Sequence, residues 1–570
     1  MSARRRIAAL LAVALALSVT ACAPALPETV VPGSAVTVGW PSAFTSGNAE
    51  AAPTPGNLDI AAMTRAGFGD LVDGEFVADD SFGTVSIVSD DPFTVRYDLR
   101  EPAWSDGIPL DAADLLLGWA AASGFIDVTP PSVDGSATAG DALPTDAATQ
   151  VPRIDEFARA IEVTYPAAID DWQSRLTVAV PAHVVAASAL GVEDPMEAKQ
   201  ALITAIEQDD TAALASIAEV WREGFTVGGK VSDGALISSG PFRVDEVAAD
   251  AQGRSLTLVP NAAYRGAATP KVAKIELVPA GADPVAEVGA GVDVVQVAPL
   301  AANREAIDDL ERRDFPVDTT HDGTVWTLLL RPGGVFSATP ARAAFLRAIP
   351  SAALMERGAG AWASAYTASS ALLAAPGGRA YDIIVEDAGF AAALTGADDS
   401  GREREAAGIA AGTPVCIVFD RADEFAAGAF SAARDAAAEA GWNVGDCGTE
   451  DLAGALEQGG WEAALVRVTI PQTADEIGAQ WGTDGLASLV GLADPAVDAL
   501  IGQLATTTDV YAERDVRAQI EAAIIRDAVA LPIALNPVIT VTDKSVAGIA
   551  ARDGRGASLT AGAVQWEVIP

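Results

Sequence analysis

The sequence predicts an α/β protein with two lobes or three subdomains. The chain has 570 residues, which is too long for one hydrophobic core, since single cores stop growing at about 250–300 residues. Half of the residues are hydrophobic, so the chain can bury enough apolar surface to fold. Strand and helix patterns follow one another along the chain, as at residues 95–119 and 414–444.

The clearest local pattern lies at residues 95–119. Apolar and charged side chains alternate over residues 95–99, which predicts a half-buried strand that ends near Arg100. Asp106-Gly107 favours a tight turn, and Asp111 stands where an N-cap would precede the apolar run at 115–119. The sequence therefore predicts a strand, a turn and a helix.

Acidic side chains dominate the charge balance. The chain has 78 Asp and Glu against 36 Lys and Arg, a net charge of −42 and a pI of about 4.2. Such a surface repels phosphate backbones and anionic membrane faces, and it keeps a protein soluble. We therefore expect no nucleic-acid partner.

Residues 1–21 have the pattern of a bacterial signal peptide. Three arginines at 4–6 precede an apolar stretch at 7–19 that is too short to span a bilayer. The sequence Val-Thr-Ala-Cys at 19–22 matches the lipobox, so we expect cleavage before Cys22 and a diacylglyceryl group on its sulfur. Residues 22–34 would form a lipid-anchored tether at the extracytoplasmic face of the cell membrane. An uncleaved signal anchor is the alternative.

A strand, a helix and a second strand are predicted at residues 414–444, with Gly441 as the helix C-cap. With Cys22 assigned to lipid, Cys416 and Cys447 remain as a possible disulfide, because adjacent parallel strands could bring these thiols together. Such a bridge would close a loop of roughly 30 residues and contribute about 3–4 kcal/mol. Two free buried thiols are the alternative.

The order W-S-D-G-x-P-L-x-A-x-D at residues 104–114 closely resembles the signature of family 5 extracellular solute-binding proteins, the oligopeptide- and dipeptide-binding lipoproteins of ABC importers. Further segments resemble this family in the same order, at residues 238–244, 255–264, 270–278, 291–294, 340–348, 494–498 and 530–533. One departure is Pro350-Ser351, which stands where the family usually has Asp-Arg.

The resemblance implies a two-lobed periplasmic-binding-protein fold of type II (Venus-flytrap), with an extra small β-rich subdomain in the first lobe. We expect the first lobe at 35–295, with the β-rich subdomain at about 50–165, and the second lobe at 296–528. Residues 529–570 would return to the first lobe, and two crossing strands would form the hinge. Within the first lobe, residues 127–150 are predicted as a loop, and residues 167–176 as a helix.

The resemblance also implies which segments face the cleft between the lobes. The candidates for ligand contact are Trp40, Asn48, Trp326, Trp362, Tyr366, Arg467, Asp475 and Trp481. Each aromatic residue taken alone could instead belong to a core. Peptide binders of the family hold the peptide's amino group with an Asp in a W-x-x-D-Y-x-D-P segment, and the corresponding residues 466–475 lack that pattern. Asp475 could substitute, or Arg467 could contact a carboxylate.

No motif in the sequence favours an enzyme. Residues 224–230 have P-loop spacing, but Val231 replaces the Ser or Thr that must hold magnesium. His183 and His321 are the only histidines, and neither has ligand spacing to a cysteine, so we expect neither metal nor cofactor.

We therefore expect a monomeric substrate-binding lipoprotein that captures a peptide or similar small solute by closure and delivers it to an ABC permease and its ATPase. Binders of sugars and nickel complexes also belong to this family, so peptide is the default rather than the only choice. A non-transport envelope lipoprotein on the same scaffold, acting through protein contacts, is the alternative.

Overall fold

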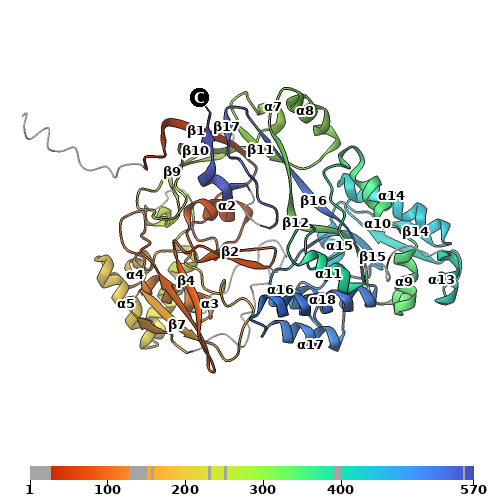
Figure 1. Cartoon of the computed structure of the whole chain (residues 1–570), viewed down its shortest axis with the longest axis horizontal. Coiled ribbons are helices and arrows are strands. Elements are labelled where there is room, and N and C mark those ends of the chain that lie inside the picture. Colours follow the sequence, from red (N-terminus) through yellow and green to blue (C-terminus); the bar gives the residue numbers. More distant parts are fainter. Residues whose placement is uncertain are drawn as a thin grey trace, which may run out of the picture.

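The computed structural model describes residues 27–126, 150–155, 159–228, 233–249, 253–389, 394, 399–555 and 559–569. The expected signal peptide, Cys22 and nearly all of the expected loop at 127–150 lie outside these described residues. The described chain is an α/β fold in which one large sheet runs through the molecule and helices pack against it (Figure 1).

Ten strands form this sheet, in the order β14-β13-β15-β12-β16-β11-β1-β10-β9-β8. We call the part that holds β1 and β8 to β11 the first lobe, and the part that holds β13 to β15 the second lobe. The strand bounds are β1 Val31–Trp40, β8 Phe242–Ala249, β9 Arg254–Pro260, β10 Val272–Pro279, β11 Val294–Val297, β12 Val317–Leu330, β13 Pro414–Val418, β14 Asn443–Asp446, β15 Ala463–Thr469 and β16 Ala530–Thr542.

Two long antiparallel strands, β12 and β16, join the lobes. Their pairing extends from Val317 opposite Val541 to Leu329 opposite Ala530. One end of β16 pairs with β11 of the first lobe, and the other end of β12 pairs with β15 of the second lobe. These are the two crossing strands that the sequence resemblance implied, and in Figure 1 they run diagonally between the two halves.

The second lobe covers both faces of its strands with helices. Because side chains alternate along a strand, Trp326 and Leu328 of β12 enter one core while Val325 and Leu329 enter the core on the opposite face. The helix bounds are α9 Thr339–Arg347, α10 Ser351–Ala359, α11 Tyr381–Ala388, α13 Ser400–Ala406, α14 Glu424–Glu439, α15 Leu452–Gln458, α16 Ala474–Trp481, α17 Pro495–Leu504 and α18 Val510–Asp527. The predicted strand, helix and strand are β13, α14 and β14.

A disulfide joins Cys416 of β13 to Cys447, which follows β14. The two strands are parallel neighbours, with Cys416 opposite Gly445, and the Cα atoms of the two cysteines lie 5.7 Å apart. The βαβ connection therefore brings together two thiols that are separated by 31 residues in the sequence.

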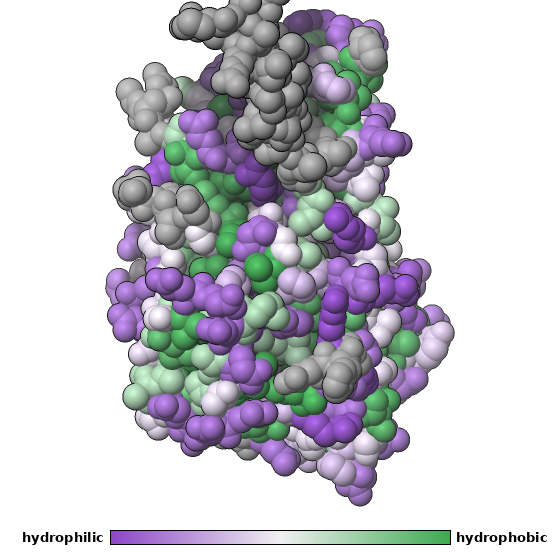
Figure 2. Space-filling view, turned by 90° about the vertical axis from the view of Figure 1, so that its left-hand side faces the viewer, coloured by the Kyte–Doolittle hydropathy of each residue, from purple (hydrophilic) through white to green (hydrophobic). Residues whose placement is uncertain are grey.

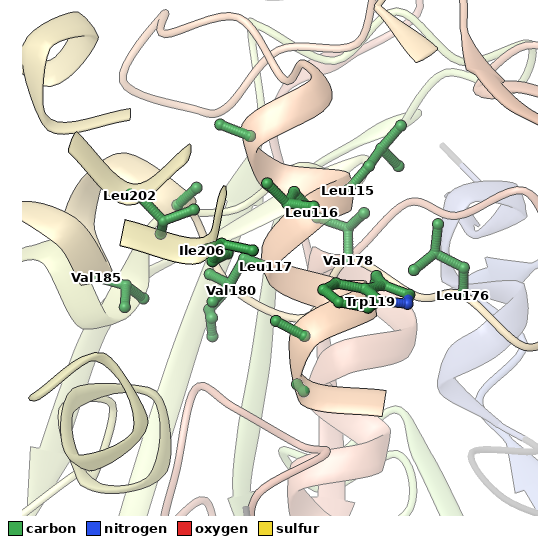
Figure 3. Packing of buried hydrophobic residues seen from close by; sticks show 14 of the residues in the cluster. Leu115, Leu116, Leu117, Trp119, Leu176, Val178, Val180, Val185, Leu202 and Ile206 are labelled. Atoms are coloured by element: carbon green, nitrogen blue, oxygen red, sulfur yellow. The ribbon is translucent and has the colours of Figure 1, made fainter. Parts of the chain in front are cut away.

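The first lobe carries a small β-rich subdomain. Its four-stranded sheet has the order β4-β5-β7-β6, and β2 and β3 form a separate hairpin. These strands are β2 Gly69–Val72, β3 Glu75–Ala78, β4 Gly83–Asp90, β5 Phe93–Leu99, β6 Arg153–Asp155 and β7 Ala160–Thr164. Helices α3 Ala112–Ala122, α4 Ala182–Leu190, α5 Pro195–Glu207 and α6 Thr211–Glu223 share one core with the four-stranded sheet. In Figure 3, Leu117 of α3 lies beside Ile206 of α5.

The other α-helices and strands of the described chain are α2 Pro55–Thr64, α7 Pro284–Glu287, α8 Ala301–Arg312, β17 Val546–Ala547 and β18 Glu567–Val568. Hydrophilic and hydrophobic side chains are interspersed over the face of the molecule that Figure 2 shows. This mixed composition is that of an ordinary solvated surface.

The predicted strand, turn and helix around residue 104 are confirmed as β5, a turn and α3. Asp111 caps α3, and Asp114 completes a capping box by accepting the backbone N–H of Asp111. The buried Trp104 donates its indole N–H to Asp114 at 3.1 Å, and the ammonium of Lys199 lies 2.7 Å from the same carboxylate. Residues 104–114 are therefore connected to α5 through the Asp114 carboxylate of α3.

The predicted helix at residues 167–176 is wrong, because the structure forms turns there. Backbone groups that a helix would pair internally bond to other segments instead. The carbonyl of Trp172 accepts the hydroxyl of Tyr97 at 2.7 Å, and the N–H of Asp170 donates to the carbonyl of Ala505 in the second lobe at 3.1 Å.

Candidate functional site

Polar and aromatic side chains meet where β12, β15 and β16 adjoin. We call this group the hinge cluster: Asp322 and Trp326 of β12, Tyr366, Phe425 of α14, Arg467 of β15 and Asn536 of β16. Three of the predicted ligand-contact candidates, Trp326, Tyr366 and Arg467, thus come together. Asp322, Phe425 and Asn536 were not predicted.

A bulge in β12 places Asp322 in the cluster. The pairing with β16 shifts between His321 and Val325, so that the intervening residues lack regular partners. Gly323 lies in this bulge with φ +76°, and a Cβ there would lie 2.6 Å from the backbone nitrogen of Arg555. Only glycine fits this position without displacement. The Asp-Gly pair inside a strand pattern was the sequence signal that could have revealed the bulge.

Asp322 is the centre of a hydrogen-bond chain. One carboxylate oxygen accepts the backbone N–H and the hydroxyl of Thr324, at 3.0 and 2.6 Å. The other accepts the amide N–H of Asn536 at 2.7 Å and lies 3.3 Å from the guanidinium of Arg467. Asn536 in turn accepts the indole N–H of Trp326 at 3.0 Å. The chain fixes the orientation of Trp326 and Arg467 together.

Three aromatic rings form the base of the cluster. Phe425 stacks on Trp326 with ring centroids 4.7 Å apart, and on Tyr366 at 4.8 Å. The guanidinium of Arg467 lies 5.8 Å from the Trp326 ring. Trp326 and Phe425 are buried, whereas Tyr366 is half-buried and 49% of the Arg467 side chain is exposed. Tyr366 and Arg467 can therefore be reached by a solute, as can the half-buried Asp322 and Asn536.

The electrostatics keep the Tyr366 phenol neutral. Burial raises the pKa of Tyr366 well above its usual range, Asp423, Glu424 and Asp322 raise it further, and Arg467 opposes them. A neutral phenol can donate a hydrogen bond, and the Arg467 guanidinium offers charged donors. The arrangement therefore offers a polar solute one neutral and one charged hydrogen-bond donor beside the half-buried Tyr366 ring.

Trp362 lies near the hinge but uses its polar group within the fold. Its indole N–H donates to the carbonyl of Leu300 at 2.8 Å, and the guanidinium of Arg304 lies 4.6 Å from its ring. It belongs to a buried cluster with Ile539 and Val541 of β16, against which Tyr366 also packs. Trp362 therefore supports the hinge cluster from behind.

The structure places Trp40, Asn48 and Trp481 in cores rather than in the hinge cluster. Trp40 donates its indole N–H to Asp59 of α2 at 2.7 Å, and burial raises the pKa of that carboxyl to about 6. Asn48 is fully buried and donates to the carbonyl of Trp221 at 2.7 Å. Trp481 is buried in the second lobe. The polar groups of Trp40 and Asn48 are hydrogen-bonded to other segments, and a local sequence pattern does not reveal these partners.

Asp475 lies between the lobes, away from the hinge cluster, and its carboxylate is 3.3 Å from the guanidinium of Arg175 in the first lobe. His183 lies 2.8 Å from the carboxylate of Asp106, where it fixes the turn before α3.

Within the described residues, no group of three or more His, Cys, Asp or Glu side chains is arranged to hold a metal ion. The same part of the chain contains no helix with the length and apolarity needed to cross a membrane.

Two lobes joined by two crossing strands are the architecture of the periplasmic-binding-protein fold. The model of the bacterial extracellular solute-binding proteins, family 5 (middle region), matches residues 84–450. The chain therefore belongs to this family of binding proteins.

The uncharacterized lipoprotein Rv2585c of Mycobacterium tuberculosis is 28% identical over 526 residues, which cover 87% of this chain and 85% of that protein. Among solved structures, the periplasmic EDTA-binding protein EppA matches with a TM-score of 0.75 and 16% identity, over 96% of this chain and 98% of that one. The oligopeptide-binding protein AppA of Bacillus subtilis, in complex with a nonapeptide, matches with a TM-score of 0.62 and 12% identity, over 94% and 99%. These two likenesses concern the fold.

Proposed function

We propose that this protein is the substrate-binding lipoprotein of an ABC importer, which captures a peptide or similar small solute between its lobes and delivers it to a membrane permease. Membership of the solute-binding family supports this role. Structures of the same fold have been solved with a nonapeptide and with the peptide STSA, which makes a peptide the first solute class to test.

The observation that carries the proposal is the hinge cluster. It combines a rigid aromatic base with two reachable polar groups, Tyr366 and Arg467, at the junction of the lobes. Residues at a hinge can contact a solute in both open and closed forms, so they hold it while the lobes move. In this proposal Arg467 meets a carboxylate or carbonyl oxygen of the solute, and Tyr366 donates its hydroxyl.

Closure requires that the solute bind the closed form more tightly than the open form. Shifting a population from about 1% to about 99% closed takes roughly 5.5 kcal/mol of differential affinity. A hydrogen bond to a charged group contributes about 1.5–3 kcal/mol, so Arg467 alone supplies part of this difference. Contacts from the first lobe must supply the rest.

Export and anchoring belong to the same proposal. We infer lipidation at Cys22 after removal of residues 1–21, and relatives of this chain are named lipoproteins. The proposed working unit is a monomer tethered at the extracytoplasmic face, with a permease and an ATPase as partners and no catalytic activity of its own. The lobe boundaries predicted from the sequence are part of this proposal.

The test is to purify the full chain under native conditions and identify its co-purified solute by mass spectrometry. The affinity of the wild type for that solute, and for a mixture of tri- to hexapeptides, is then measured by calorimetry. Arg467→Ala should weaken binding by about 10- to 100-fold, the equivalent of one hydrogen bond to a charged group. Tyr366→Phe should weaken it less, because a neutral hydrogen bond contributes about 1 kcal/mol.

Arg421 offers a matched control. Its side chain is 48% exposed, pairs with Asp446 at 2.8 Å and lies 5.9 Å from the ring of Phe419, much as Arg467 lies near Asp322 and Trp326. Arg421→Ala should bind the solute as the wild type does. The proposal fails if no solute is found and no peptide binds, or if both arginine variants lose affinity equally.

A further inference from the structure

Two segments of the first lobe contact the second lobe beside the bulge in β12, where the N–H of Ile470 donates to the carbonyl of Gly323. One is the tip of the β2–β3 hairpin, residues 72–75, and the other is the turn segment at residues 166–176. We call these two segments the clasp. In Figure 1 the hairpin extends from the first lobe toward the second, near α11 and α16.

The hairpin tip binds α18 through an ion pair between Glu75 and Arg514. The Glu75 carboxylate lies 3.0 Å from Nε of Arg514 on α18 and 3.1 Å from the guanidinium of Arg379, which precedes α11. Both Glu75 and Arg514 are mostly buried by the contact, so this ion pair is less screened than a surface pair. Gly74 has φ +79°, and a Cβ there would lie 3.3 Å from a guanidinium nitrogen of Arg517. The tip is shaped for close approach.

The turn segment caps α16 from the other lobe. The Asp170 carboxylate accepts the N–H of Ala474, the first residue of α16, at 2.8 Å. The backbone N–H of Asp170 donates to the carbonyl of Ala505 at 3.1 Å. On the first-lobe side, the hydroxyl of Tyr97 donates to the carbonyl of Trp172 at 2.7 Å. The segment is thus bonded to both lobes at once.

Arg175 adds a charged bridge beside this cap. Its guanidinium lies 2.9 Å from Asp171 of its own lobe and 3.3 Å from Asp475 in the first turn of α16. The next residue of α16, Glu476, pairs with Arg555 of the C-terminal segment. Three consecutive residues at the start of one helix, 474–476, therefore contact segments that lie outside the second lobe.

We propose that the clasp holds the two lobes together by protein contacts alone, so that the closed form is already populated before a solute arrives. This inference rests on the proposed function, since it concerns the equilibrium between the open and closed forms of the same binding protein. A solute then has to bind the minor open form, and its apparent affinity falls by the fraction of molecules that are open. Weakening the clasp therefore raises the open fraction and speeds entry.

The test measures closure in the full chain after exhaustive dialysis, with native mass spectrometry to verify that no solute is attached. Fluorophores on the exposed residues Glu207 of α5 and Glu439 of α14 report the distance between the lobes by energy transfer. The variant is Glu75→Gln with Arg175→Ala, which leaves the net charge unchanged. The control is Glu567→Gln with Arg153→Ala. It removes the same two charges from ion pairs within the first lobe.

The wild type should show one population with high energy transfer. The clasp variant should gain a second, low-transfer population, with the closed-to-open ratio reduced by roughly tenfold for the three ion pairs lost between the lobes. The control should match the wild type. An open wild type, a clasp variant that stays closed, or an equal shift in the control would each overturn the inference. Because no solute is present, a failure of solute capture would not alter this result.

Discussion

Replacing Asp114 tests how much a buried ion pair contributes to the stability of the β-rich subdomain. It is fully buried and accepts hydrogen bonds from Lys199 at 2.7 Å, Ala182 at 2.8 Å, Asp111 at 3.0 Å and Trp104 at 3.1 Å. Asp114→Ala leaves an ammonium whose side chain is 3% exposed beside three N–H donors without this acceptor. Removing one partner of a buried ion pair costs about 3–5 kcal/mol, and each orphaned donor costs about 1–3 kcal/mol.

Lys199 keeps two other contacts, the carbonyl of Pro109 at 2.6 Å and the carboxylate of Asp111 at 3.2 Å. We therefore expect Asp114→Ala to lower the unfolding free energy of this subdomain by about 4 kcal/mol, within the range for a buried pair. The assay is native-state hydrogen exchange by mass spectrometry, read from peptides of α3 and α5, because a chain of this size does not unfold as one unit.

The double variant Asp114→Ala with Lys199→Met should be more stable than Asp114→Ala alone, because no unpaired charge stays buried. Asp435→Ala, which removes an exposed carboxylate 3.0 Å from Arg357, should cost less than about 1 kcal/mol. A loss below about 1 kcal/mol for Asp114→Ala, or purely additive effects in the double variant, would refute the reasoning.

Two further predictions concern buried carboxylates. The Glu521 carboxylate is fully buried and accepts the N–H groups of Leu372 and Leu373 at 2.9 to 3.1 Å, so Glu521→Gln should lower the local unfolding free energy by about 1–3 kcal/mol in native-state hydrogen exchange of α18 peptides, and unchanged exchange would contradict this. Burial raises the pKa of Asp170 to about 7. The charged groups that face it are Asp171, Arg517 and Glu513. When the lobes separate, its pKa should return toward its usual value of about 4, so closure takes up a proton. The favourable contribution is complete below about pH 4 and is lost as the pH rises through 7. The closed fraction should therefore be larger at pH 6 than at pH 8 in the energy-transfer assay, and Asp170→Asn should reduce this difference.

Local signals predicted the elements whose determinants lie within one or two turns of chain. The strand, turn and helix around Trp104 follow from alternation, an Asp-Gly turn and an Asp cap, all within about 20 residues. The segment at 167–176 was mistaken for a helix because its partners, Tyr97 and the start of α16, lie about 75 and 300 residues away. No local pattern carries that information.

The candidate site was predicted in part for the same reason. The family resemblance indicated the segments that hold Trp326, Tyr366 and Arg467, and the structure brings these residues together. Asn536 joins the cluster only because of the register of β16 opposite the bulge in β12, and this register cannot be predicted from the sequence. Trp40 was chosen on the same grounds as Trp326, yet its indole N–H is satisfied by Asp59 inside the first lobe.

The pairing of β12 with β16 has a mechanical consequence. A pair of flexible linkers would let the two halves swivel in any direction, whereas a hydrogen-bonded ribbon resists shear and yields mainly by bending and twisting about its own axis. If the halves move, the ribbon therefore restricts them to rotation about one shared axis. The bulge at Gly323 lies next to the other contacts between the halves, because the N–H of Ile470 donates to its carbonyl and Ala474, which bonds Asp170, follows four residues later.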